Sequence, residues 1–314
     1  MADVIKTATR DAYGKALVEL GQKNDKVIVF DADLAAATKT GMFKKEFPER
    51  FIDCGIAEGN MMGVAAGMAT AGYTVFASSF AMFAAGRAFE QVRNTIGYPH
   101  INVKIGATHA GISVGEDGAS HQCCEDIALM RTIPGMTIIN PADDVEARLS
   151  VMAAAEIDGP VYMRFGRLAV PRIFDENYKF EIGKGVYLTE GTDVTIVSTG
   201  LMVERALAAA EQLKAEGISA AVINMATIKP LDKEILLDAA NKTGCIVTAE
   251  EHNVIGGLGS AVAEALAEAK PVPVLRVGVE DVFGKSGPAL ELLDIYGLNA
   301  ANIVAKAKAA IALK

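Results

Sequence analysis

Residues 51–78, FIDCGIAEGNMMGVAAGMATAGYTVFAS, decide the fold class of this chain. They begin with a short apolar strand at 51–54, continue through a glycine-rich helix at 59–70 and end in a second apolar strand at 74–78. Short strands that are almost wholly apolar are typical of parallel sheets, whose strands are buried on both faces. The stretch therefore predicts one strand–helix–strand unit of a parallel sheet with helices packed on it.

The same alternation of strand and helix continues on both sides of this unit. In the first half we expect further strands at 26–31, 101–105, 137–139 and 160–164 and helices at 4–22, 83–96, 123–131 and 143–156. In the second half we expect strands at 193–198, 220–224, 245–249 and 273–277 and helices at 202–216, 230–240 and 259–269. The prediction is an α/β protein of two doubly wound, mostly parallel-sheet domains, at 1–175 and 192–314, with a linker at 176–191.

The composition argues against several classes of partner. The 314 residues suit two domains, and a share of 51% hydrophobic and 22% charged residues is ordinary for a globular protein. The net charge of −9 argues against binding to nucleic acid or an anionic membrane. The four cysteines lack the paired spacing of a zinc site, and the N-terminus lacks the apolar core of a signal peptide. We therefore expect a reduced, cytoplasmic protein.

The uncharged run at 59–86 has a second interpretation as a membrane span. Its 28 residues are long enough to cross a bilayer, and Gly59, Gly63 and Gly67 repeat at the spacing of packed membrane helices. The run is interrupted at Gly72, however, and a strand follows. A buried helix whose glycine face lies at a subunit interface is the favoured interpretation.

Glu58 is the only charge between the strand at 51–54 and the uncharged run. A carboxylate in such apolar surroundings requires a charged partner or a raised pKa. An acid of this kind is a candidate functional group. The alternative is a glutamate that interacts favourably with the dipole at the N-terminus of its helix.

The glycine-rich loop at 107–122 holds two of the four histidines, His109 and His121, with acids close by, among them Asp117. Polar groups gathered on a loop over an α/β sheet indicate a binding or catalytic site. Metal ligation is one alternative, although the spacing matches no standard metal motif. A solvated surface loop is the other.

Arg164 and Arg167 stand at the end of the strand at 160–164. Two guanidinium groups there suit the bidentate binding of a phosphate or carboxylate, and salt bridges at a surface or interface are the alternative. The Gly-Gly-Leu-Gly turn at 256–259 opens a helix and is either an anion site or a tight structural turn.

Together these motifs resemble the C-terminal two-thirds of transketolase, and also deoxyxylulose-phosphate synthase. Three segments carry the resemblance, which extends over nearly the whole chain: Gly-Ile-Ala-Glu at 55–58, Gly-Glu-Asp-Gly-x-x-His-Gln at 115–122 and Glu-Glu-His-Asn-Val-Ile-Gly-Gly-Leu-Gly at 250–259. The resemblance implies a pyrimidine-binding domain followed by the family's C-terminal domain, with thiamine diphosphate as cofactor.

The resemblance also implies roles for individual residues. Glu58 corresponds to the glutamate that hydrogen-bonds N1′ of the cofactor's aminopyrimidine and so promotes proton loss from C2 of the thiazolium. Phe80 and Phe83 correspond to the aromatic pair that packs the pyrimidine ring, with plain core packing as the alternative. The implied substrate-handling residues are the catalytic histidines His109 and His121, Asp117 for a substrate hydroxyl, Arg167 with Arg164 beside it for the sugar phosphate, and Asp33 near the dimer interface.

Two departures from the family pattern change what is expected. The sequence contains no Gly-Asp-Gly, the motif with which the family binds Mg²⁺ and the diphosphate. We therefore expect a partner chain, the N-terminal transketolase subunit, to carry that motif and to share the cofactor. The expected assembly is a heterotetramer in which this chain pairs with itself, and the stoichiometry with the partner is open. Ala36-Ala37-Thr38 stands where transketolases have Pro-Ser, a serine that helps hold substrate phosphate, so the choice of sugar is open.

The resemblance thus implies the C-terminal subunit of a transketolase that transfers a two-carbon ketol unit from a ketose phosphate to an aldose phosphate. No metal ligand is expected on this chain itself. The alternatives are a subunit like deoxyxylulose-phosphate synthase, a subunit like the β chain of a 2-oxo-acid dehydrogenase, or a partner without catalytic function. His109 and His121 favour transketolase, since sugar hydroxyls need such partners and oxo acids do not.

Overall fold

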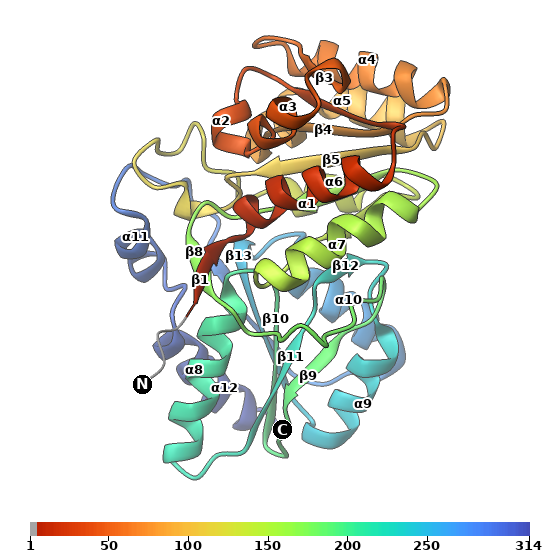
Figure 1. The fold of residues 1–314 in the computed structure, drawn as a ribbon. Helices are drawn as coiled ribbons and strands as arrows, with labels where there is room; N and C mark the ends of the chain where they lie inside the picture. Colours follow the sequence, from red (N-terminus) through yellow and green to blue (C-terminus); the bar gives the residue numbers. More distant parts are fainter. Residues whose placement is uncertain (1–4) are drawn as a thin grey trace.

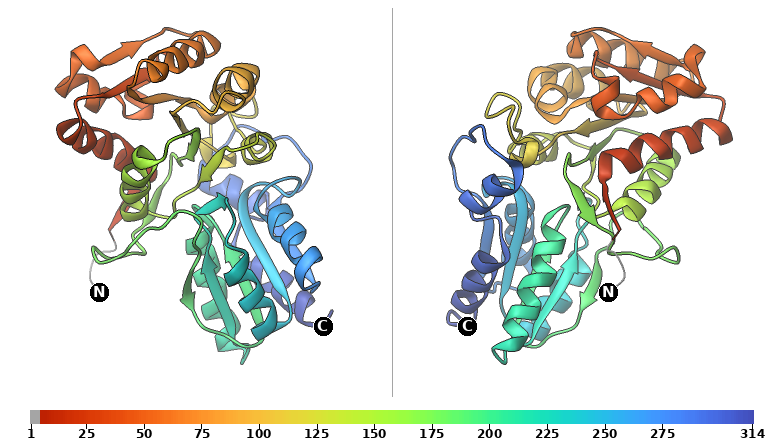
Figure 2. Two further views of the ribbon diagram at one scale, coloured as in Figure 1. Left: turned by 90° about the vertical axis from the view of Figure 1, so that its right-hand side faces the viewer. Right: turned by 60° about the vertical axis from the view of Figure 1, so that its left-hand side comes forward.

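The computed structural model describes residues 5–314, and each half of the chain is built on its own sheet (Figure 1). The first half, coloured red to yellow-green, forms the upper part of the molecule, and the second half, teal to blue, forms the lower part. Figure 2 shows the same division from two further sides. Both sheets are mostly parallel, which confirms the predicted α/β class.

The first sheet has seven strands in the order β12-β6-β7-β5-β4-β2-β3. All neighbouring pairs are parallel except β12 and β6. The strands are β2 (Val27–Asp31), β3 (Phe51–Asp53), β4 (Thr74–Phe80), β5 (Val103–Thr108), β6 (Thr137–Ile139), β7 (Val161–Arg164) and β12 (Thr227–Lys229). The helices of this half are α1 (Thr9–Lys23), α2 (Ala35–Thr38), α3 (Gly41–Glu46), α4 (Glu58–Thr70), α5 (Phe89–Gln91), α6 (Asp126–Arg131) and α7 (Asp144–Glu156).

Helices cover both faces of this sheet because its strands are apolar on both sides. Alternate residues of β2 show this directly: Val29 packs in one buried cluster with Leu17 of α1 and Val151 of α7. Phe30 packs in another cluster with Met61 of α4 and other residues of that face. The arrangement is a doubly wound sheet, as predicted.

The second sheet has five strands in the order β14-β13-β10-β11-β9, and only β9 is antiparallel to its neighbour. The strands are β9 (Val186–Thr189), β10 (Val194–Ser198), β11 (Ala220–Asn224), β13 (Ile246–Asn253) and β14 (Val274–Val279). The helices are α8 (Met202–Ala215), α9 (Lys233–Thr243), α10 (Leu258–Ala269), α11 (Ala289–Ile295) and α12 (Ala300–Ile311). Helices α8 and α12 share one core cluster, and α9 and α10 share the other, so this sheet is also covered on both faces.

The two halves are joined more closely than a simple linker implies. Strand β12 comes from the second half of the chain and pairs with β6 of the first sheet. Strand β9 lies inside the predicted linker and pairs with β11. The division at residues 175 and 191 stays a prediction.

Several predicted elements differ from the observed ones. The helix predicted at 4–22 begins only at Thr9, because Lys6–Ala8 form strand β1, antiparallel to β8 (Ala169–Pro171). The helix predicted at 83–96 is interrupted: two π-helical segments, Met82–Arg87 and Val92–Gly97, flank the short α5. Helices α11 and α12 follow the last strand and were not expected.

The uncharged run at 59–86 forms α4, β4 and most of the first π-helical segment. Within residues 5–314 no helix has both the length and the apolar character needed to cross a membrane. The glycine face of α4 is open, since a side-chain carbon added at Gly63 or Gly67 would meet no atom within 4 Å.

Candidate functional site

The site lies where the order of strands in the first sheet reverses. From β2 the chain moves outward to β3, then returns to β4 on the other side of β2 and continues to β5. Ligands of such sheets bind outside the carboxyl ends of the strands at this reversal. Phe80 ends β4, His109 follows β5 directly, and Asp33 follows β2, so three predicted site residues stand at this edge.

Four of the predicted residues form one aromatic cluster. The ring of Phe80 stacks on the imidazole of His109 with a centroid distance of 3.8 Å. Phe83 lies 6.0 Å from Phe80 in a parallel arrangement. The imidazole of His121 meets Phe83 edge-on at 5.3 Å. Segments that are far apart in the sequence are thus brought together at one end of the sheet.

Glu58 is the first residue of α4, and its side chain is only 2% exposed. Its carboxylate accepts no hydrogen bond from a described backbone N–H of the helix. Instead, Nη1 of Arg87 donates to both oxygens, at 2.9 Å to Oε2 and 3.1 Å to Oε1. The guanidinium of Arg87 lies 4.5 Å from the ring centre of Phe83. The carboxylate therefore has the charged partner that its burial requires, and that partner connects it to the aromatic cluster.

Arg87 was not singled out from the sequence, although one signal marks it. It is the first charged residue after the 28 uncharged residues that follow Glu58. Two opposite charges at the ends of such a run are natural partners, because each needs compensation in apolar surroundings.

His109 is held in one tautomer by its neighbours. Its side chain is buried, with Nη1 of Arg10 at 2.8 Å from Nε2 and Oγ1 of Thr108 at 2.9 Å from Nδ1. A guanidinium can only donate, so Nε2 accepts, and Nδ1 carries the proton and donates to Thr108. Burial, followed by the positive charges of Arg10, Arg167 and other nearby groups, lowers the pKa of His109 to about 3. The imidazole is therefore neutral at physiological pH.

Positive charges gather around His109. Arg10 of α1 also donates to the carbonyl of Ala37, 3.1 Å away. Arg167 donates to the carbonyl of Val114 and, at 2.9 Å, to the carboxylate of Glu116. No local sequence signal marked Arg10, because only the fold brings α1 next to the loop at 107–122.

The remaining predicted residues occupy different positions. Asp117 and Asp33 both have exposed side chains. Asp33 has a φ of 61°, in the left-handed region, and its backbone N–H donates to Asp53.

Arg164 is placed apart from the others. Its side chain is 3% exposed, and its Nε donates at 2.8 Å to the carboxylate of Asp126. Its Nη2 donates at 2.8 Å to the carbonyl of Glu251 in the second half of the chain. Arg164 lies inside buried strand β7, whereas Arg167 lies beyond the end of that strand. This geometry gives Arg164 a structural role between the halves and does not support the predicted contact with substrate.

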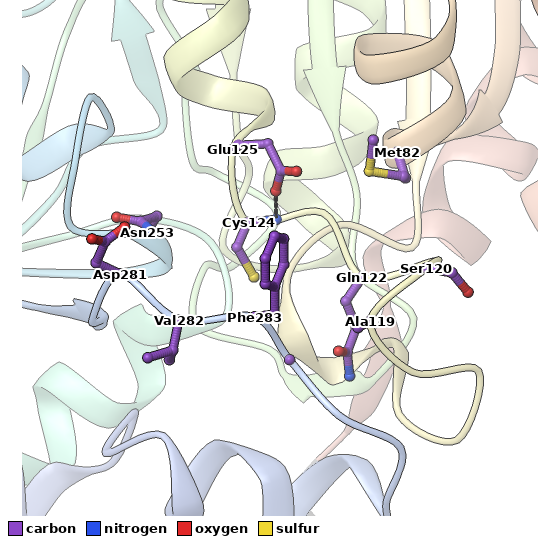
Figure 3. A pocket seen from close by; sticks show the side chains of 11 residues that line it. Met82, Ala119, Ser120, Gln122, Cys124, Glu125, Asn253, Asp281, Val282 and Phe283 are labelled. Atoms are coloured by element: carbon purple, nitrogen blue, oxygen red, sulfur yellow. Dashed lines mark hydrogen bonds between the residues drawn. The ribbon is translucent and has the colours of Figure 1, made fainter.

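A cavity of about 480 Å³ lies between the halves of the chain, beside the loop at 119–122 (Figure 3). Met82, Ser120 and Gln122 line it from the first half, and Asn253 and Phe283 line it from the second. Cys124 also lines the cavity and is labelled in Figure 3. None of the predicted site residues line this cavity.

Comparison with known proteins identifies the two halves. Residues 5–172 match the family model of the transketolase pyrimidine binding domain, and residues 183–303 match that of the transketolase C-terminal domain. A putative transketolase C-terminal section from Methanocaldococcus jannaschii is 54% identical over 94% of this chain and 93% of its own length. A 6-deoxy-6-sulfo-D-fructose transketolase subunit from a Clostridium species is 47% identical over 94% of this chain and 92% of its own length.

A solved structure agrees with this assignment. A split gene transketolase, an inactive β4 tetramer, superposes with a TM-score of 0.92. It is 59% identical in sequence, and the match covers 98% of this chain and 99% of the other.

The environment of His109 predicts an unusual pH dependence. Its folded pKa lies below the unfolded value of about 6.5, so between about pH 6.5 and 3 the unfolded state takes up a proton that the folded state does not. The free energy of unfolding should fall as the pH drops through this interval, and less so in His109→Gln. In an NMR titration of the parent protein, the imidazole signal of His109 should keep the chemical shift of the neutral form down to pH 5. The signal is assigned by its loss in His109→Gln. A midpoint near pH 6.5 would contradict the geometry described here.

Proposed function

Because the chain belongs to the transketolase family and matches its C-terminal section, we propose that it is the pyrimidine-binding subunit of a split, thiamine-diphosphate-dependent transketolase. The observation that carries this proposal is the buried carboxylate of Glu58, joined through Arg87 to an aromatic cluster that includes both predicted histidines. A buried acid next to aromatic rings, with neutral and polar groups nearby, suits the binding of an aminopyrimidine.

The residues present fit the pyrimidine half of the cofactor. Glu58 would hold a proton at N1′ of the aminopyrimidine, and Phe80 and Phe83 would pack the ring. When bound, the cofactor supplies the electron sink for breaking and forming the carbon–carbon bond. A carboxyl group that shares a proton with N1′ must be shielded from water, and the 2% exposure of the Glu58 side chain meets that requirement.

His109 and His121 would handle the substrate next to the reacting carbon. His109 is held as a neutral imidazole by Arg10 and Thr108, so it would stand beside the substrate without a charge of its own. His121 is partly exposed and stands at the edge of the aromatic cluster, open to a ligand. The exposed Asp117 would hydrogen-bond a hydroxyl group of the substrate, as the resemblance implies.

The anionic end of the substrate would meet Arg10 and Arg167. Both guanidinium groups lie close enough to His109 to lower its pKa, which supports an anion site beside that histidine. A guanidinium can donate parallel N–H bonds to two oxygens of either a phosphate or a sulfonate. The related subunit named for 6-deoxy-6-sulfo-D-fructose makes a sulfonate sugar as plausible a substrate as a phosphate sugar.

The diphosphate and Mg²⁺ would be held by a partner subunit with a Gly-Asp-Gly motif. The sequence lacks that motif, and residues 5–314 contain no group of three or more His, Cys, Asp or Glu side chains arranged to hold a metal. The related split transketolase is inactive as a β4 tetramer, in agreement with a need for a second kind of chain. We infer that this chain also pairs with itself and that two copies of each subunit form the active enzyme.

The test is to assemble the chain with its partner, thiamine diphosphate and Mg²⁺ and to measure ketol transfer over a panel of sugars. Glu58→Gln should slow both transfer and hydrogen–deuterium exchange at C2 of the bound cofactor about 10²–10⁴-fold, because glutamine cannot share a proton with N1′. Glu46→Gln, which changes an exposed acid of α3, is the matched control and should behave as the parent. Equal exchange in Glu58→Gln and parent, with saturating cofactor, would show that the mechanism is misassigned.

Removing a guanidinium should reveal the anion site. Arg167→Met should raise the KM for an anionic sugar about 10–100-fold, since losing a charge-assisted hydrogen bond costs about 1.5–3 kcal/mol. The KM for an uncharged sugar is the internal control and should change far less, as should the affinity for the cofactor. If the KM for the anionic sugar stays unchanged, Arg167 only supports the loop through Val114 and Glu116.

A further inference from the structure

Arg87 is the residue that holds Glu58, and no function considered so far explains it. We propose that Arg87 is a positioning residue: through Nη1, which contacts both oxygens, it holds the Glu58 carboxylate in the orientation in which it would meet the pyrimidine of the cofactor. The proposal rests on the function proposed above for Glu58.

The geometry shows that Glu58 depends on Arg87. A single nitrogen, Nη1, lies within hydrogen-bond distance of both carboxylate oxygens. Within residues 5–314 no other donor, including the backbone N–H groups at the start of α4, makes a hydrogen bond to the carboxylate. The Glu58 side chain is 2% exposed, so water does not replace a lost partner. Without Arg87 the carboxylate would be a buried charge with free rotation about its side chain.

Arg87 also connects Glu58 to the surface on which the pyrimidine would stack. Phe83 and Arg87 come from the same π-helical segment, in which the N–H of Ala88 bonds the carbonyl of Phe83. The guanidinium lies 4.5 Å above the centre of the Phe83 ring, a distance typical of a cation–π contact. One side chain therefore sets the distance between the acid and the aromatic face, the two groups assigned to the pyrimidine. Isolated π-helical turns of this kind are frequent at functional sites.

The alternative is that Arg87 blocks the place of the pyrimidine. Removing Arg87 would then change cofactor binding and C2 exchange in the opposite direction. The Arg87 side chain is 51% exposed, so it has room to swing away from Glu58. If it occupied the place of the pyrimidine, its removal would tighten cofactor binding and speed C2 exchange. If it positions Glu58, its removal slows C2 exchange, because the carboxylate is no longer aligned with N1′.

Two measurements test the proposal. In the assembled enzyme with saturating cofactor, Arg87→Met should slow C2 hydrogen–deuterium exchange about 10–100-fold, the cost of misplacing a reacting group by about 1 Å. Arg87→Lys, which keeps the charge, should give an intermediate rate. In the chain alone, unfolding of Glu58→Gln, Arg87→Met and the double variant should show coupling: the double variant is destabilised by less than the sum of the single ones.

The control is Arg93→Met, since Arg93 is an exposed arginine that contacts Asn94 on the second π-helical segment. It should leave both the exchange rate and the coupling unchanged. The proposal would be overturned if Arg87→Met exchanged at the parent rate, or if it exchanged faster and bound the cofactor more tightly. It would also be overturned if the double variant were destabilised by the full sum of the single variants. If Arg87→Met does not assemble, the rate of Arg87→Lys decides by the same criteria. Unchanged exchange in Glu58→Gln would instead reject the proposed function, so the two failures are distinguishable.

Discussion

The ion pair between Glu58 and Arg87 is the contact on which the rest of the site depends. A carboxylate at the start of α4, shielded from water, needs a charged partner, and Arg87 supplies it from a segment 29 residues further along. The pair joins α4 to the π-helical segment that also carries Phe83. The ring of Phe83 makes an edge-to-face contact with the imidazole of His121, and the neighbouring Phe80 stacks on His109.

The second half of the chain supports the loop that carries the histidines. The carboxylate of Glu251, at the carboxyl end of the strand β13, accepts the backbone N–H of Ser113 at 2.7 Å. Gln122, at the other end of the loop, donates to the carbonyl of Lys285 at 3.0 Å. Arg164 completes the junction by joining Asp126 to the carbonyl of Glu251. The site is therefore formed by the first sheet, while the second sheet holds its loop in place.

Sequence patterns predicted the fold class and part of the site, for physical reasons. The strands were recognisable because both of their faces are buried, and Glu58 stood out because it is a lone charge in an apolar stretch. Arg10 was missed because its partner lies 99 residues away, beyond the reach of any local pattern. Arg87 lies 29 residues from Glu58, and its only signal is its place at the end of the uncharged run. Arg164 was grouped with Arg167 because the two are close in sequence, but a strand end separates them: one is buried in β7 and the other is past it. The π-helical segments and β12 were missed because apolar spacing alone does not distinguish a π-turn from an α-turn or reveal pairing with a distant sheet.

We propose that this chain carries half of a cofactor site, the half that binds the pyrimidine. The most direct measurement is a calorimetric titration of thiamine diphosphate with Mg²⁺ into the chain alone, the partner alone and their mixture. We expect saturable binding in the mixture, with one cofactor for each pair of subunits, and no saturable binding by this chain alone at the same concentrations. Tight, Mg²⁺-dependent binding to this chain by itself would contradict it.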